Sequence, residues 1–139
     1  MNGLGLDVIT PPLDGTILPG VTRASCLALA SDPAFGASIA SASSTPTGTT
    51  LHPAERTFSL SDLERWSASG TLLEILCVGT AAIVAAAHQI GFDGRVVVRV
   101  PTYPSDPNGL GPVGRALREK ILAVQEGREE YEGWGVMCE

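Results

Sequence analysis

The chain has 139 residues, of which 44% are hydrophobic, and carries a formal net charge of −6 at pH 7. This length suits a single domain with a sizeable core. The negative charge and the lack of a basic run argue against a nucleic-acid partner, and no apolar stretch reaches the ~18 residues that a membrane-spanning helix needs. Residues 1–7 resemble neither a signal peptide nor a transit peptide. We therefore expect no targeting segment and an intracellular protein, cytoplasmic or mitochondrial.

The first third of the chain predicts a strand, a turn and a helix. Residues 6–9 have the apolar character of a short strand that ends at Pro11-Pro12. Pro19-Gly20 is a turn signal, and Thr22 is a good N-cap residue before a stretch without proline or glycine. We expect a helix that begins at Thr22 and continues to residue 30.

The middle of the chain changes composition sharply. Residues 32–52 are rich in Ser, Thr, Gly, Ala and Pro, which predicts a loop of disordered type at the surface. Residues 55–59 suggest a strand. The sequence from Ser61 to Glu64 fits a capping box that opens a short helix through Trp66.

The remaining elements alternate between strand and helix patterns. Apolar runs over 72–78 and 81–87, separated by Gly79-Thr80, predict two strands, and 95–100 predicts a third after a turn at Asp93-Gly94. Four apolar residues repeat along one face of a helix expected over 113–125 and packed on the sheet: Val113, Leu117, Ile121 and Val124. The order of elements favours the α/β class.

Two short segments could bind an anion. The amides at the start of the helix near Thr22 lack intrahelical partners and lie at the positive end of the helix dipole, which suits a phosphate. Gly79-Thr80-Ala81 could form an anion-binding turn from a hydroxyl and free amides. Taken alone, each segment could equally be a capped helix start or a tight connection that binds nothing.

The cysteines and histidines are scattered. Cys26, Cys77 and Cys138 form no C-x-x-C pair, and both histidines are isolated, so we expect no metal site. Cys26 and Cys77 lie in apolar surroundings and are expected to be buried, in a reducing compartment, whereas Cys138 is expected at the surface. A catalytic thiol would need an activating partner that the sequence does not place.

The order of several motifs resembles the branched-chain amino-acid aminotransferases, which are class-IV pyridoxal-phosphate enzymes. The motifs are residues 10–23, Glu55-Arg56, Gly79-Thr80-Ala81, Gly111-Pro112 and residues 125–129. The resemblance implies the C-terminal, large-domain portion of a fold-type IV enzyme, with a mixed sheet and flanking helices over 1–139 and without the N-terminal small domain. Cys77-Val78 depart from the Gly-Ser that is common in the family.

The same resemblance implies roles for particular residues. The backbone amides of Val21 and Thr22, and Thr80 as well, would bind the phosphate of pyridoxal 5′-phosphate. The amides of Thr80 and Ala81 would face the carboxylate of the substrate. The substrates implied are leucine, isoleucine and valine, with 2-oxo acids such as 2-oxoglutarate as acceptors, in branched-chain amino-acid biosynthesis.

A lysine raises the main question about activity. The family uses a lysine that forms a Schiff base with the cofactor and lies upstream of the segment matched by residues 10–23. The single lysine here, Lys120, is expected on the surface of the last helix. We therefore assign no catalytic residue and expect the chain alone to be inactive, as a truncated or degenerate aminotransferase. The alternatives are a partner chain that associates with a full-length aminotransferase subunit, a homodimer, and an unrelated small α/β binding domain.

Overall fold

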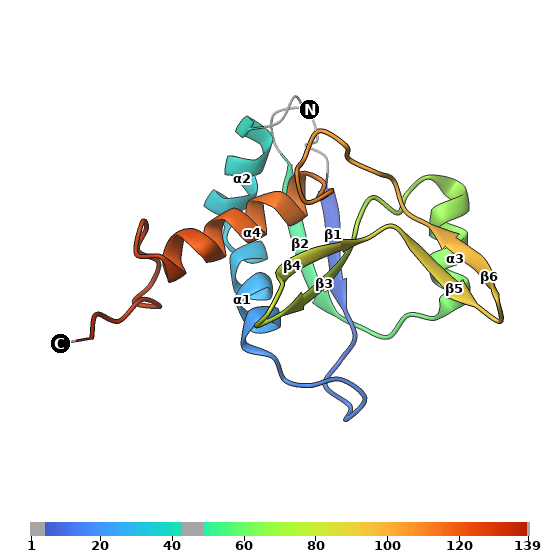
Figure 1. Ribbon diagram of the computed structural model, residues 1–139, viewed down its shortest axis with the longest axis horizontal. Coiled ribbons are helices and arrows are strands. Elements are labelled where there is room, and N and C mark those ends of the chain that lie inside the picture. The colour runs from blue at the N-terminus through green and yellow to red at the C-terminus, as the bar shows by residue number, and fades with distance from the viewer. Residues whose placement is uncertain (1–4, 43–48, 139) are drawn as a thin grey trace.

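The structure is a computed structural model that describes residues 5–42 and 49–138. Helices and strands follow one another along the chain in a mixed α/β order (Figure 1): β1 (Gly5–Thr10), α1 (Val21–Ala30), α2 (Pro33–Ala42), β2 (Thr50–Glu55), α3 (Leu60–Ser69), β3 (Ile75–Gly79), β4 (Ile83–Ala87), β5 (Gln89–Phe92), β6 (Arg95–Arg99) and α4 (Pro112–Gln125). Within the described residues, none of the helices has the length and apolar character to cross a membrane.

The strands form three separate pairs. β1 and β2 are parallel, with Val8 opposite Pro53, whereas β3–β4 and β5–β6 are antiparallel hairpins. The α/β class is confirmed, but the prediction of one mixed sheet is wrong for the described residues. Short connections favour pairing within the β3–β4 and β5–β6 hairpins, and among the described strands no hydrogen bonds join the three pairs into one sheet.

A hydrophobic core lies where α1, α2 and α4 meet the first two strand pairs. Figure 1 shows these three helices on one side of the molecule and α3 beside β6 on the other. Buried residues from both helices and strands form one cluster: Cys26, Leu29, Ala30, Phe35, Ile39, Leu51, Val84, Leu110, Leu117 and Ile121. At the far side, the Ser67 hydroxyl of α3 donates to the Arg99 carbonyl of β6 at 2.6 Å.

The loop predicted over 32–52 is wrong in most of its described part. Residues Pro33–Ala42 form α2 instead. The Asp32 carboxylate accepts the Ala34 amide at 2.9 Å, which satisfies one free donor of the first turn. Phe35 and Ile39, four residues apart, are both buried on one helix face. Residues 43–48 of the predicted loop lie outside the described residues.

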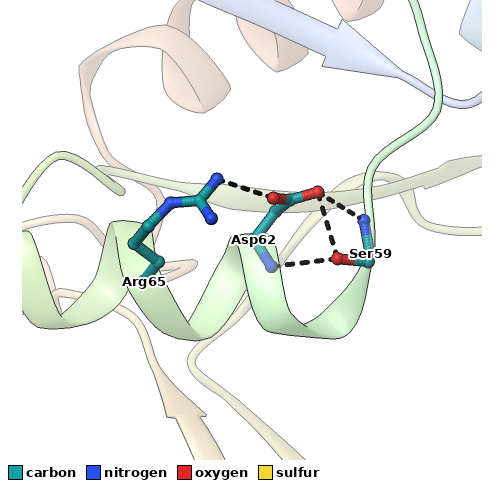
Figure 2. Close-up of polar contacts among 3 residues, drawn as sticks. All are labelled: Ser59, Asp62 and Arg65. Carbon is teal, nitrogen blue, oxygen red and sulfur yellow. Dashed lines mark hydrogen bonds and ion pairs between the residues drawn. The ribbon is translucent and has the colours of Figure 1, made fainter.

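The boundaries of β2 and α3 also differ from the prediction. The strand expected over 55–59 is wrong, because β2 covers Thr50–Glu55 and ends where its pairing with β1 ends. The capping box is formed by Ser59 and Asp62 rather than Ser61 and Glu64 (Figure 2): the Ser59 hydroxyl accepts the Asp62 amide at 3.1 Å, and the Asp62 carboxylate accepts the Ser59 amide at 2.9 Å. The sequence contains two overlapping serine–acid patterns, Ser59 to Asp62 and Ser61 to Glu64, and the first of them caps α3.

The second half follows the prediction more closely. The expected strands match β3, β4 and β6, and the expected helix matches α4, whose predicted inner residues Leu117, Ile121 and Val124 are buried. β5 was not predicted. It pairs with β6 through a turn in which Asp93 and Gly94 have φ values of 52° and 75°. Successive left-handed residues are typical of tight hairpins.

Candidate functional site

The N-terminus of α1 is open to solvent. The helix begins at Val21, with Gly20 as its N-cap, so the prediction of Thr22 as the N-cap is wrong. Gly20 has an extended conformation (φ −70°, ψ 139°), and its amide donates to the Leu18 carbonyl at 2.8 Å. As a glycine, the N-cap residue has no side chain that could accept a first-turn amide, and Val21 is 83% exposed. The amides of Val21 and Thr22 therefore stand in the first turn, where a helix has no internal acceptors for them.

The segment before α1 is ordered by local bonds. Both the amide and the hydroxyl of Thr16 donate to the Asp14 carboxylate, and this pair of bonds holds the pKa of Asp14 below its ordinary value. Leu18, two residues before Gly20, is 85% exposed. The loop that precedes α1 thus has a defined local conformation and exposes the apolar residue Leu18.

Thr80 and Ala81 lie in the turn that joins β3 to β4. Both are exposed. The turn ends at Ile83, which has a left-handed φ of 61°. From α4, the Arg118 guanidinium donates to the Ala82 carbonyl at 2.7 Å, so a helix distant in sequence holds the turn.

The two predicted anion-binding segments lie at the same end of the molecule. In Figure 1 the N-terminal end of α1 and the turn between β3 and β4 lie at the same end of the molecule, and α1 packs against β3. Val78 and Ile83, on either side of the turn, pack on the cluster that contains Cys26 of α1. We refer to the amides of Val21 and Thr22 together with Thr80 and Ala81 as the candidate site.

Arg23, in the first turn of α1, is a residue next to the candidate site whose contacts could not be predicted from the sequence. Its Nε donates to the Thr10 hydroxyl at 3.1 Å and its Nη2 to the Pro11 carbonyl at 2.8 Å. Nη2 also lies 3.3 Å from a carboxylate oxygen of Glu55, and the arginine side chain is only 12% exposed. These partners come from the ends of β1 and β2. No signal in the sequence joins residues so far apart.

Glu74 is the other residue that only the structure reveals. Its carboxylate accepts the amides of Val113 and Gly114, each at 3.0 Å, and so caps α4. Burial raises the pKa of Glu74, and the amide bonds oppose that rise. A Cβ on Gly111 would lie 2.5 Å from Glu74 Cδ, so the glycine makes room for this cap. Glu74 therefore has a structural role, as the cap of the N-terminus of α4.

The cysteines divide by burial. Cys26 is buried in α1, and burial raises the pKa of its thiol to about 11, so the thiol stays protonated at neutral pH. The prediction that Cys77 is buried is wrong, because on β3 the neighbours Leu76 and Val78 pack on the core and Cys77 is exposed. Nowhere in the described ranges do three His, Cys, Asp or Glu side chains gather as metal ligands.

Lys120 lies on α4 and is already engaged. Its ammonium pairs with the Glu129 carboxylate and lies 5.4 Å from the centre of the Tyr131 ring. The Tyr131 hydroxyl in turn donates to the Asp32 carboxylate at 3.0 Å. The lysine thus helps to hold the segment after α4 against the start of α2.

Comparisons of the sequence with known proteins identify relatives. No family model matches the chain. The cytosolic branched-chain-amino-acid aminotransferase of Saccharomyces cerevisiae is 34% identical over 92% of this chain and 30% of the relative. The mitochondrial branched-chain-amino-acid aminotransferase of Schizosaccharomyces pombe is 33% identical over 94% of this chain and 27% of the relative. The branched-chain-amino-acid aminotransferase of Dictyostelium discoideum is 32% identical over 96% of this chain and 30% of the relative.

These similarities extend over nearly the whole described fold. The chain is a relative of the aminotransferases. More specifically, it is homologous to part of the branched-chain amino-acid aminotransferases and spans about 30% of the length of the first of these relatives.

Proposed function

We propose that this chain forms the phosphate-binding part of a branched-chain amino-acid aminotransferase, corresponding to the C-terminal portion of the large domain of a fold-type IV enzyme. One observation carries the proposal: α1 begins without a side-chain cap beside the β3–β4 turn, at one end of the molecule. The relatives are aminotransferases by name, and enzymes of this kind use pyridoxal 5′-phosphate. The proposed location is the cytosol or the mitochondrion, as in the names of the relatives.

The residues present fit a phosphate group. Free amides at a helix N-terminus donate hydrogen bonds to an anion, and the helix dipole adds about half a positive charge. In the proposed role, the Val21 and Thr22 amides and Thr80 bind the phosphate. The amides of Thr80 and Ala81 bind the carboxylate of leucine, isoleucine, valine or a 2-oxo acid. The cofactor, when bound, supplies the electron sink for chemistry at the α-carbon.

The lysine required for transamination is proposed to come from outside these 139 residues. Lys120 is held by Glu129 and Tyr131, and the Tyr131 hydroxyl donates to Asp32, just before α2. By itself the chain is then catalytically incompetent.

A second candidate function is a partner chain that completes the site of a full-length aminotransferase subunit, or of a second copy. The exposure of Leu18 and Val21 beside the candidate site favours it, because apolar side chains at a rim suit contact with another protein surface. Copurification of this chain with a lysine-bearing aminotransferase subunit would support it, and a monomer that ignores such a subunit would contradict it.

Removal of a single amide tests the phosphate role. Proline is tolerated in the first helical turn and lacks an N–H, and the extended conformation of Gly20 suits a residue before proline. We expect Val21→Pro to weaken binding of pyridoxine 5′-phosphate about tenfold or more, because a hydrogen bond to a charged group contributes about 1.5–3 kcal/mol.

Val21→Ala is the matched control, since it shortens the same side chain and keeps the amide. Binding is followed through the NMR shifts of the Thr22 and Thr80 amides, and the probe carries no aldehyde that could react with an amine. Equal affinity in Val21→Pro and Val21→Ala would refute the role of this amide. Absence of saturable shifts in the unaltered chain would refute the phosphate site.

A further inference from the structure

Arg23 connects the first turn of α1 to the ends of β1 and β2. It is the third residue of the helix, yet its guanidinium bonds the Thr10 hydroxyl, the Pro11 carbonyl and the Glu55 carboxylate. The arginine side chain is 12% exposed, so these partners hold it in a largely enclosed position. Its donors are directed to three acceptors on two segments of the chain, residues 10–11 and Glu55.

The loop between β1 and α1 does little to orient the helix by itself. Within it, the described bonds are local: the Asp14 amide to Pro12, Thr16 to Asp14, and the Gly20 amide to Leu18. Such bonds shape the loop but do not join it to the strands. The bonds of Arg23 do reach the ends of β1 and β2, and only Thr22 separates Arg23 from Val21.

We propose that Arg23 is a positioning residue that sets the direction in which the Val21 and Thr22 amides point at the phosphate. This inference rests on the proposed function of the candidate site. The planar guanidinium presents donors in a rigid fork, so it can fix three acceptors at once, whereas an ammonium group cannot hold the same geometry. Arg23 acts through the backbone and does not itself bind the ligand.

A purely electrostatic role makes a different prediction. The positive charge of Arg23 offsets the carboxylate of Glu55, and its loss would leave that negative charge unbalanced. If charge balance were the whole effect, removal of Glu55 as well would restore binding. If Arg23 positions the helix, removal of both side chains leaves the amides misdirected.

The experiment titrates the folded chain with inorganic phosphate and follows the NMR shifts of the Val21, Thr22 and Thr80 amides. We expect Arg23→Lys to weaken phosphate binding by about tenfold or more, the range typical for loss of a group that orients a ligand. The double variant Arg23→Ala/Glu55→Gln is expected to bind as weakly. Arg65→Lys is the matched control and should bind like the unaltered chain, because Arg65 is 67% exposed and pairs with Asp62 on α3 (Figure 2).

Each outcome either supports or overturns the positioning role of Arg23. Unchanged affinity in Arg23→Lys, or recovery of affinity in the double variant, overturns the positioning role while the phosphate site stands. No saturable shift in the unaltered chain overturns the site and the inference together. If Arg23→Lys does not fold, Thr10→Val removes one acceptor alone. A severalfold loss of phosphate affinity in Thr10→Val then supports the inference, and an unchanged affinity overturns it.

Discussion

At the residue scale, Gly79 is a glycine that the fold of the described chain does not itself require. A Cβ at this position would meet no atom within 4 Å. The residue is also absent from the glycines with positive φ. Neither backbone conformation nor packing within the described chain therefore requires glycine at the end of β3. The open space above it adjoins the turn that carries Thr80 and Ala81.

Gly79→Ala is expected to leave stability nearly unchanged and to weaken binding of pyridoxine 5′-phosphate, because the added methyl group enters that open space. Urea denaturation and a binding titration measure the two effects separately. Gly70→Ala is the matched control: Gly70 also has open space around it but has a φ of 75°, so its replacement should cost about 1 kcal/mol of stability and leave binding unaffected. Normal binding in Gly79→Ala would argue against a ligand at this turn.

At the scale of the element, the N-terminus of α3 allows the capping roles of two nearby serines to be compared. Ser59 forms both bonds of the capping box (Figure 2), and Ser61 lies within the helix. We expect Ser59→Ala to lower the free energy of unfolding by about 1 kcal/mol, the usual cost of a lost N-cap. Ser61→Ala should change it by a few tenths at most. Urea denaturation of both variants checks this, and equal effects would contradict the assignment of the cap.

The cap of α4 should make stability depend on pH. Burial raises the pKa of Glu74 above its ordinary value of 4.5. A raised pKa in the folded state means that the fold favours the protonated form, so the stabilising effect is complete below the unfolded pKa. It is lost as pH rises through the folded pKa.

Glu74→Gln removes this titration while it keeps a carbonyl acceptor for α4. The difference in unfolding free energy, unaltered chain minus variant, should therefore decrease as the pH rises above about 4.5 and then level off. Denaturation in urea at a series of pH values measures it. Glu64→Gln, an exposed site on α3, serves as the control. A difference that increases with pH would show that the amide bonds outweigh burial.

For the whole molecule, we expect no transamination of leucine with 2-oxoglutarate by this chain alone in the presence of pyridoxal 5′-phosphate. The physical reason is that the Lys120 ammonium is paired with Glu129 and lies against the Tyr131 ring, so it is already engaged. An assay for glutamate formation tests this. Turnover that disappears in Lys120→Arg would contradict the proposal, because it would identify Lys120 as the missing lysine.

The degree to which each part of the fold could be predicted follows the range of the interactions involved. α4 was predicted because its buried face repeats within one helix. α2 was not, because only two large apolar side chains, Phe35 and Ile39, attach it to the core, and they stand among small residues that are typical of a loop. The start of α3 was misplaced because the Ser59–Asp62 and Ser61–Glu64 patterns overlap, and the sequence alone does not say which of them forms the cap.

The same argument applies to the candidate site. Its residues Val21, Thr22, Thr80 and Ala81 were identified from short motifs and from resemblance, and their binding roles remain predictions. The supports, Arg23, Arg118 and Glu74, could not be found in this way, because their partners lie far away in the chain. A hydrogen bond between distant residues leaves no local pattern in a single sequence.

The sequence by itself determined the α/β class, most element positions and the relationship to branched-chain aminotransferases, because these depend on local periodicity and short motifs. Only the tertiary structure decided that α1 begins at Val21 with open amides, that the β3–β4 turn lies at the same end, and that Lys120 is engaged elsewhere. Those outcomes depend on packing and hydrogen bonds between segments that are remote in sequence, and only the folded chain brings such segments together.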